Sequence, residues 1–523
     1  MKRDIISVII IVFLSVQFLN AQNQSINETG LTYLRSNLEI LASDLFEGRE
    51  TATRGEQLAA LFISKELAKY GVKPFGDDGT YFQYFDILVR TVEPETELKI
   101  ISKLEVSKVL RLGDDFYFSK ENMPSDKYKG IESNIVFAGY GITAASYDYD
   151  DYSGIDVKNK VVLLQAGIPT IDEKEFSAED KKRFDDRKYK FENANNHGAA
   201  GVLTILTGTK MKYWEFLKKH AVSPSVSLLN TEEEDNYSIP VALLSEESAK
   251  FLLTGEKNSY DEIIEAKENG KSLPGFDLTK KIVFNYEVNS EIKQGRNVIG
   301  IIEGTKEKLK DEYVVLTAHY DHEGIVGGEI YNGADDDGSG TVAILEAGRR
   351  LALLKKNKRS ILIIFHAGEE KGLLGSEYLT NNSDFISEVI SDINVDMVGR
   401  EDTESIYSIG SGNLSNELYE LVESVNSETV KFKLDYTFDE PNDPNRYYYR
   451  SDHYNYAKQN IPIVFFYDHM TEDYHKPTDD VDKINFEKIE KVSTLITELA
   501  LRIANLDHRL KLDKKLERLG GPK

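Results

Sequence analysis

Tyr313-Val-Val-Leu-Thr-Ala-His-Tyr-Asp321 is an apolar run that ends in a histidine and an acid. Ser360-Ile-Leu-Ile-Ile-Phe-His-Ala-Gly-Glu-Glu370 follows the same pattern, and an amphipathic stretch, residues 339–354, separates the two. Two more apolar runs follow at residues 393–398 and 461–466. Apolar strands that alternate with helices indicate a largely parallel sheet that is covered on both faces. The predicted fold class is therefore α/β, with a mostly parallel mixed sheet sandwiched by helices.

The rest of the chain differs in pattern from this region. Residues 31–70 carry apolar side chains at helical spacing and are predicted to be helical. Short β-like runs recur over residues 93–285, which predicts a β-rich domain inserted into the first. The first domain is accordingly expected to be discontinuous, made of residues 30–92 and 286–507. A charged C-terminal tail, residues 508–523, follows it.

Charge and the N-terminal segment limit the possible partners and location. The net charge of -25 argues against nucleic acid as a partner, because phosphate binding needs a basic surface. Residues 1–21 combine a basic head, a short apolar run and a small residue, which is typical of a secretory signal peptide. We therefore expect an exported protein, periplasmic or secreted, with no stable membrane span after signal cleavage.

Potential metal ligands gather where the predicted strands end. His319, Glu370 and Asp396 lie at or just beyond three strand ends, and His475 lies in the loop after the fourth. In open α/β sheets, sites form beyond the carboxyl ends of the strands. Buried carboxylates are costly unless cations neutralise them. Because the chain has no cysteine, a metal here must be held by His, Asp and Glu, which suits catalytic zinc.

These residues also resemble a known family. The motifs His319-x-Asp, Gly333-Ala-Asp-Asp-Asp-x-Ser-Gly340, Glu369-Glu370, a strand Asp and Tyr474-His-x-Pro are similar to those of the double-zinc exopeptidases, peptidase family M28. That family includes bacterial leucyl aminopeptidases, plasma glutamate carboxypeptidase and glutamate carboxypeptidase II. The resemblance covers about residues 35 to 90 and 290 to 500, including Leu41-Ala-Ser-Asp-Leu-Phe-Glu-Gly-Arg49. It implies a phosphorylase/hydrolase-like zinc exopeptidase fold.

The resemblance implies two zinc ions per chain. One zinc would take His319 and Asp396, the other would take Glu370 and His475, and Asp336 would bridge them. The sequence leaves a one-residue ambiguity, because Asp335 and Asp337 flank Asp336. The bond Asp336-Asp337 is expected to be cis, as it is in the family.

The same resemblance gives roles to three further residues. Asp321 would accept the other ring N–H of His319 and fix its tautomer. Glu369 would be the general base that takes a proton from the zinc-activated water. Tyr474 would stabilise the oxyanion. His366 is predicted to be a packed histidine, while His322 and Glu323 are predicted to be loop residues beside the site.

The implied activity is removal of N-terminal residues from peptides. A carboxypeptidase or dipeptidase is the nearest alternative and needs a basic residue for the substrate carboxylate, with Arg400, Arg446 and Arg450 as candidates. A glutaminyl-cyclase-like transferase or a non-catalytic binding protein are further alternatives. The inserted region, with Asn134-Ile-Val-Phe-Ala-Gly-Tyr-Gly-Ile and Asn195-Asn-His-Gly-Ala-Ala-Gly, resembles a protease-associated domain. No catalytic residue is assigned to that domain.

Overall fold

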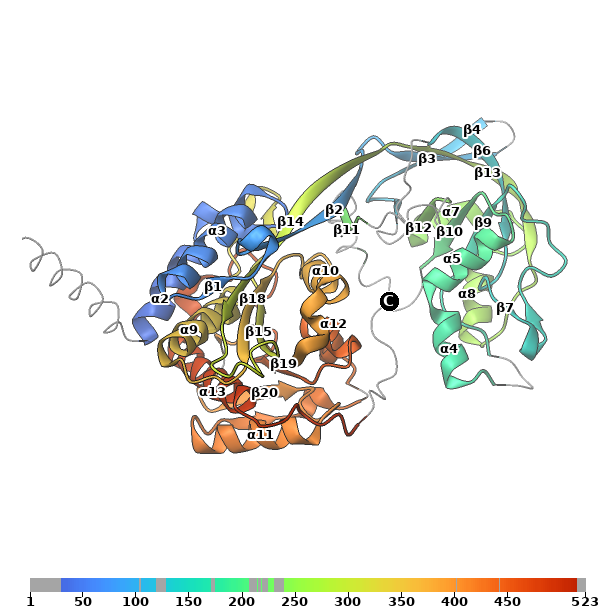
Figure 1. The fold of residues 1–523 in the computed structure, drawn as a ribbon. Helices are drawn as coiled ribbons and strands as arrows, with labels where there is room; N and C mark the ends of the chain where they lie inside the picture. Colours follow the sequence, from blue (N-terminus) through green and yellow to red (C-terminus); the bar gives the residue numbers. More distant parts are fainter. Residues whose placement is uncertain are drawn as a thin grey trace, which may run out of the picture. The chain divides into compact units, whose positions relative to one another are not determined.

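The four apolar runs form adjacent strands of one sheet in the computed structural model of the chain (Figure 1). Their order in the sheet is β18 (Ser360–His366), β15 (Tyr313–His319), β19 (Val389–Asp396) and β22 (Ile463–Tyr467). The pairs β15–β18, β15–β19 and β19–β22 are all parallel. Every residue of β18 and β19 is buried, which requires cover on both faces of the sheet. The predicted α/β class is confirmed.

The structure describes residues 30–102, 105–118, 128–170, 175–206, 214, 218, 224–229, 239–400, 402–441 and 443–514. The chain divides into two compact units, one containing the residues up to Asp86 and from Gln294 onward, the other containing Ile87–Lys293. The predicted signal segment, residues 1–21, lies outside the described residues. Among the residues that are described, no helix has the length and apolar character needed to cross a membrane.

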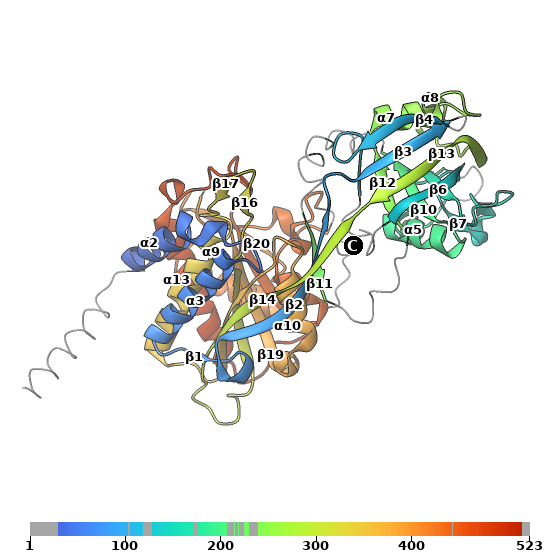
Figure 2. The ribbon, with the colours of Figure 1, turned by 90° about the horizontal axis from the view of Figure 1, so that it is seen from above.

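Antiparallel strands flank the parallel centre of the first unit's sheet. β14 (Val288–Ile302) pairs antiparallel with β18, and β20 (Ser405–Ile409) pairs antiparallel with β22. The sheet continues beyond β14 with β2 (Phe82–Val92) and beyond β20 with β21 (Lys433–Asp435), while β1 (Lys73–Pro74) pairs with β14. Figure 2 shows β2 beside β14. A hairpin of β16 (Gly324–Val326) and β17 (Glu329–Tyr331) follows β15.

Helices cover both faces of this sheet (Figure 1). α9 (Gly338–Leu354) and α13 (Phe486–Ala504) contact β15 and β19 on one face, and α12 (His453–Lys458) contacts β19 and β22 on the other. α9 is buried on nearly all sides, so its small residues allow close packing against α13. The remaining helices of this unit are α2 (Gly30–Leu41), α3 (Arg54–Lys69), α10 (Leu374–Asn382) and α11 (Asn416–Glu428).

The single helix predicted over residues 31–70 is wrong, because α2 ends at Leu41 and α3 begins at Arg54. Arg49 lies fully buried in the break. Its guanidinium donates hydrogen bonds to the carbonyl oxygens of Leu41, Tyr320, Asn332 and Gly333 over 2.6–3.0 Å. Burial lowers the pKa of Arg49 only to about 10, so it stays charged. Arg49, in the break, therefore holds the loops that follow β15. The spacing of apolar residues could not predict this break, because it reflects only contacts between neighbouring helical turns.

The second unit holds a mixed eight-stranded sheet. Its order is β4-β3-β13-β6-β9-β10-β12-β5, with β6, β9, β10 and β12 mutually parallel. The charged connections, which the sequence did not mark as regular, form helices α4 (Ala178–Asp185), α5 (Arg187–Asn196), α7 (Glu246–Leu253) and α8 (Tyr260–Glu268). The strands are β3 (Glu97–Ser102), β4 (Glu105–Arg111), β5 (Phe116–Phe118), β6 (Tyr128–Phe137), β9 (Val161–Gln165), β10 (Gly201–Ile205), β12 (Val241–Leu244) and β13 (Phe276–Tyr286), with β7 (Thr143–Ala144), β8 (Tyr149–Asp150) and β11 (Ser225–Leu228) outside this sheet.

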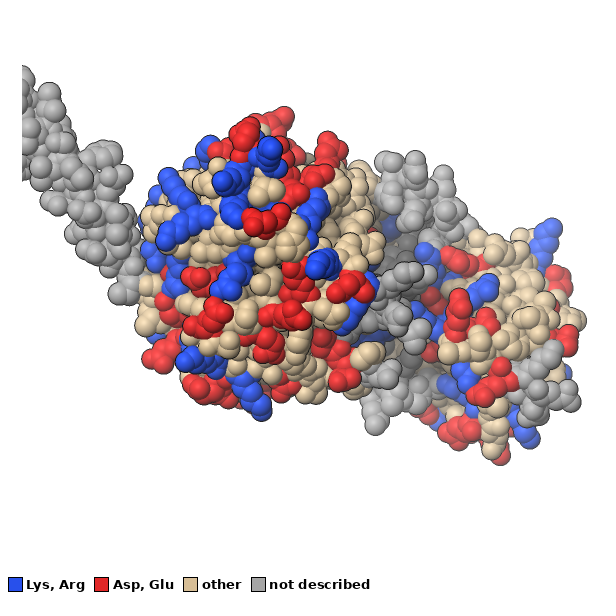
Figure 3. Space-filling view, turned by 60° about the horizontal axis from the view of Figure 1, so that its bottom comes forward, with Lys and Arg blue, Asp and Glu red and all other residues tan. Residues whose placement is uncertain are grey.

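The described part of the charged tail lies against the first unit. His508 Nε2 is 2.7 Å from Glu417 on α11, and the carboxylate of Asp513 accepts the backbone N–H of Asn416. Figure 3 shows acidic and basic side chains interspersed over the visible face of the first unit. On this face the acidic side chains are thus not collected in one patch.

Candidate metal centre and active site

Two neighbouring strands and a loop bring the first group of ligand atoms together. His319 ends β15 and Asp396 ends β19, and these strands pair in parallel. His319 Nε2 lies 3.5 Å from Asp396 Oδ1 and 3.4 Å from Asp336 Oδ1. All three side chains are buried. The arrangement predicted for the first zinc is therefore geometrically available.

A second group lies on the other side of Asp336. His475 Nε2 lies 3.2 Å from Asp336 Oδ2 and 3.0 Å from Glu370 Oε2. Glu370 follows β18, and His475 lies in the loop after β22. The two oxygens of Asp336 thus face two different histidines, His319 and His475. This is the arrangement that a carboxylate bridging two cations needs.

The structure distinguishes the three consecutive aspartates by what each side chain faces. Asp335 Oδ1 accepts the backbone N–H of Gly399 at 2.8 Å, away from the histidines. Asp337 caps α9, because its Oδ1 accepts the N–H of Gly340 at 2.8 Å. Asp336 alone of the three lies within ion-pair distance of His319 and His475. The bond Asp336-Asp337 is cis, as expected.

Buried ligand atoms at this place have no hydrogen-bond partner among the described residues. A buried polar atom without a partner destabilises the fold, so these atoms are expected to bind a ligand. Histidine nitrogens and carboxylate oxygens are suitable for zinc. Three of the groups of His, Asp and Glu that could hold a metal contain His319 or His475, and the fourth contains His322. The residues therefore fit the expected metal ions; the atoms concerned are His319 Nε2, His322 Nε2, Asp335 Oδ2, Asp336 Oδ2, Asp337 Oδ2, Asp396 Oδ1 and His475 Nε2.

The electrostatics of the site also favour a cation. Although burial lowers the pKa of His475, the carboxylates of Glu370 and Asp336 raise it to about 11. Burial disfavours the charged form of Glu370, yet the neighbouring histidines lower its pKa to about 2. The carboxylates thus retain positive charge on His475. A divalent cation would replace those protons, and its binding would release them.

Glu369 and Asp321 lie beside these ligands. Asp321 Oδ1 accepts the backbone N–H of Glu369 at 3.2 Å, and Asp321 Oδ2 accepts the hydroxyl of Thr51 at 2.8 Å. His319 Nδ1 lies 3.1 Å from the backbone oxygen of Asp321 and 3.6 Å from its carboxylate. Asp321 therefore lies beside His319, but its backbone oxygen rather than its carboxylate is the atom within hydrogen-bond distance of the ring, and its carboxylate additionally holds the backbone of Glu369. That second contact was not anticipated.

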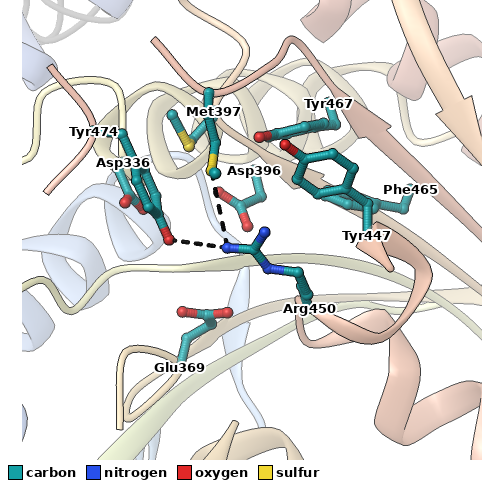
Figure 4. Close-up of a pocket in the computed structure, with 10 residues that line it drawn as sticks. Asp336, Glu369, Asp396, Met397, Tyr447, Arg450, Phe465, Tyr467 and Tyr474 are labelled. Carbon is teal, nitrogen blue, oxygen red and sulfur yellow. Dashed lines mark hydrogen bonds between the residues drawn. The ribbon is translucent and has the colours of Figure 1, made fainter. Parts of the chain in front are cut away.

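An open pocket lies over the ligand cluster (Figure 4). Glu369 faces into it, and burial together with Glu370 and Asp396 raises the pKa of its carboxyl. Tyr474 packs on the ring of His475, with 3.8 Å between ring centroids, and its hydroxyl lies 3.5 Å from the guanidinium of Arg450. The pocket is lined by Asp336, Glu369, Asp396, Met397, Tyr447, Arg450, Phe465, Tyr467, Met470 and Tyr474.

His322 and Glu323 are loop residues beside the site, as predicted, and each of them contacts one of the predicted metal ligands. His322 is fully buried, and its Nδ1 lies 2.8 Å from Glu370 Oε1. Glu323 Oε1 lies 3.3 Å from His475 Nδ1, where it can fix the tautomer of that ring. The spacing His319-x-x-His322 was the available signal. It was not decisive, because the direction of a side chain in a loop depends on tertiary contacts.

The prediction for His366 is confirmed. It is buried between Asn297 Oδ1 at 3.3 Å and the hydroxyl of Tyr456 at 3.1 Å. Burial lowers the pKa of His366 to about 3, so the ring is neutral at physiological pH. His453 likewise packs in the interior, with its ring stacked on Phe465 at 4.4 Å.

Asp479 holds the backbone of the loop that carries Asp336. Its carboxylate accepts the backbone N–H groups of Asp335 and Asp336 over 3.0–3.1 Å. The guanidinium of Arg400 donates to Asp479 Oδ1 at 2.6 Å and to Asp473 Oδ2 at 3.1 Å. Asp479 lies four residues beyond His475. It therefore ties the loop of one ligand to the loop of another.

We expect Asp479→Asn to weaken metal binding by about 10–100-fold, the usual cost of losing a residue that orients ligands. An amide cannot accept two backbone N–H groups and the guanidinium of Arg400 with both of its terminal atoms. The measurement is competition titration of zinc with a chromogenic chelator. The neighbouring Asp480→Asn serves as the matched control. Equal zinc affinities of the two variants would show that Asp479 does not help to position the metal ligands.

Comparisons with known proteins agree with this geometry. The family model described as peptidase family M28 matches residues 297–500. Residues 297–500 form a peptidase family M28 domain. This M28 domain contains all five predicted metal ligands, as well as Asp321, Glu369 and Tyr474.

Curated relatives match the chain over different lengths. Aminopeptidase YwaD of Bacillus subtilis is 29% identical over 332 residues, which are 61% of this chain and 66% of that protein. A probable leucine aminopeptidase of Arthroderma benhamiae is 28% identical over 51% of this chain and 80% of its own. A probable glutamate carboxypeptidase of Zea mays is 36% identical over 22% of this chain, but the match spans only 15% of that protein.

Solved structures show the same fold. An aminopeptidase from Aneurinibacillus sp. strain AM-1 superposes with a TM-score of 0.58 at 19% identity, covering 93% of this chain and 97% of its own. A zinc aminopeptidase from Bacillus subtilis gives a TM-score of 0.51 at 20% identity, with 94% and 97% covered. The chain thus carries a metallopeptidase domain of the zinc aminopeptidase fold.

Proposed function

We propose that the M28 domain is a two-zinc aminopeptidase that removes N-terminal residues from peptides. The observation that carries this proposal is Asp336, whose two carboxylate oxygens face His319 on one side and His475 on the other. One zinc would be held by His319 and Asp396, the other by Glu370 and His475. When bound, the two ions would supply Lewis acidity to the substrate carbonyl and to the attacking water.

The protein's own residues would move the protons. Glu369 faces the pocket beside the ligand cluster, where its carboxylate would take a proton from the attacking water and return it to the leaving amine. Asp321 holds the backbone of Glu369 in place through the N–H. The hydroxyl of Tyr474 would donate to the oxyanion that forms at the scissile carbonyl.

The wall of the pocket suits an apolar first residue. Met397, Phe465 and Tyr467 lie on this wall and are buried. Tyr447 and Met470 complete it. An apolar side chain placed there would be removed from water, which stabilises the bound substrate by about 25 cal/mol per Å² of buried surface.

The test combines a chelator with a panel of dipeptides. We expect a metal-chelating agent to abolish hydrolysis of leucyl substrates with a free N-terminus, and zinc to restore it. Substrates with a blocked N-terminus should remain uncleaved. Full activity of the chelated protein would reject the metal mechanism, and cleavage of N-blocked substrates would reject the aminopeptidase assignment while leaving the hydrolase intact.

A further inference from the structure

Three arginines are candidates for binding a substrate carboxylate, and they differ in their partners and in their position relative to the pocket. Arg400 is held by Asp473 and Asp479 and lies 3.8 Å from Asp335, so its charge is already balanced. Arg446 lies over the ring of Tyr449, 5.1 Å from its centroid, and does not line the pocket. Arg450 does line it.

The guanidinium of Arg450 points into the pocket, toward the hydroxyl of Tyr474 (Figure 4). Its Nη2 contacts the hydroxyl of Tyr474 at 3.5 Å and the sulfur of Met470 at 3.9 Å. The guanidinium lies 5.1 Å from the ring centroid of Tyr447, which supports it from the side. Within the described part of the chain, no Asp or Glu oxygen lies within 4.0 Å of it.

The positive charge of Arg450 is unusual at this position, because the side chain faces the predicted metal site. Of the side chains that line the pocket, the only other ionisable acids are the carboxyl groups of Asp336, Glu369 and Asp396. In the proposed function, Asp336 and Asp396 would hold the metal ions and Glu369 would transfer the proton. A fixed guanidinium next to bound cations raises their mutual repulsion, so an anion is required to balance it.

A carboxylate is the anion that suits both the guanidinium and a peptidase. Arg presents parallel N–H donors that match a carboxylate with two hydrogen bonds. We infer that Arg450 binds a carboxylate of the substrate next to the scissile bond. This inference rests on the proposed function and narrows it to short peptides with a free C-terminus, above all dipeptides, or to peptides with an acidic residue after the cleaved bond.

The experiment compares leucyl-alanine, leucyl-alanine amide and leucyl-aspartic acid amide in the zinc-loaded full chain. We expect the protein to cleave leucyl-alanine with a higher kcat/KM than its amide. Arg450→Gln should lower kcat/KM on leucyl-alanine by about 10–100-fold, the loss of one charged hydrogen-bonded contact, and leave the amide nearly unchanged. Arg450→Lys should fall between the two, because it keeps the charge without the paired donors.

Arg446→Gln is the matched control, since it removes the same charge four residues away and should leave all three rates unchanged. If leucyl-aspartic acid amide is cleaved faster than leucyl-alanine amide, and Arg450→Gln removes that difference, Arg450 also binds a side-chain carboxylate. If the two amides are cleaved at the same rate, Arg450 binds only the C-terminal carboxylate. An equal loss on free and amidated substrates would overturn the inference and assign Arg450 to the oxyanion instead. Absence of all hydrolysis by the unaltered protein would reject the proposed function itself.

Binding gives a second readout that does not depend on turnover. In Glu369→Gln, calorimetric titration with leucyl-alanine should show binding that is weakened about 10–100-fold by the added Arg450→Gln. The titration with leucyl-alanine amide should be the same in both variants. Equal affinity for leucyl-alanine with and without Arg450 would contradict a carboxylate contact.

Discussion

Glu369→Gln is expected to lower kcat by about 10²–10⁴-fold, the usual contribution of a positioned general base. The amide has nearly the shape of the carboxylate, and the backbone N–H of residue 369 still donates to Asp321. It cannot accept the proton, however. The measurement is steady-state hydrolysis of a leucyl anilide together with elemental analysis for zinc.

The zinc content of Glu369→Gln decides how the loss is interpreted. We expect it to equal that of the unaltered protein, because Glu369 is not needed to hold either ion in the proposed arrangement. Glu377→Gln on α10 provides a control at a glutamate that does not line the pocket. Turnover within a few-fold of normal, with zinc retained, would show that another group takes the proton.

Asp336→Asn should remove the link between the two metal sites. An asparagine offers one uncharged oxygen, so it cannot face both His319 and His475 with a carboxylate oxygen. We expect zinc content to fall from two ions to one or none, and kcat/KM to fall by about 10²–10⁴-fold as several kcal/mol of charge stabilisation are lost. Loss of tight zinc binding also lowers the free energy of unfolding by about 3 kcal/mol at 100-fold excess over Kd.

The flanking aspartates are the controls for this variant. Asp335→Asn and Asp337→Asn keep an oxygen that can accept the backbone N–H groups of Gly399 and of Gly340, respectively. Both should therefore retain two zinc ions and a normal melting temperature in the presence of zinc. If either flanking variant loses a zinc ion and Asp336→Asn does not, the bridging assignment is wrong by one residue.

The α/β class and the place of the site can be predicted from local sequence patterns. Apolar runs such as residues 313–318 and 360–365 are long enough to be recognised as buried strands from local composition alone. Because the strands lie parallel, their carboxyl ends meet at one edge of the sheet. His319, Glu370 and Asp396 could therefore be placed together without coordinates.

Which side chains face the metal ligands depends on contacts between segments that are distant in the sequence. The sequence does not show which of Asp335, Asp336 and Asp337 is the metal ligand. In the structure, Asp336 is the one of the three that contacts both His319 and His475. The break between α2 and α3 likewise depends on Arg49 reaching carbonyls more than 270 residues away. Local periodicity contains no information on such contacts.

The pocket over the predicted metal ligands shows the same limit of the sequence. Arg400 and Arg450 were equivalent candidates in the sequence, but one is balanced by Asp473 and Asp479 while the other faces the open pocket. What distinguishes them is the position of loops that follow different strands. The sequence therefore determined the chemistry that the site contains, and the packing of those loops decided which charges remain available to a substrate.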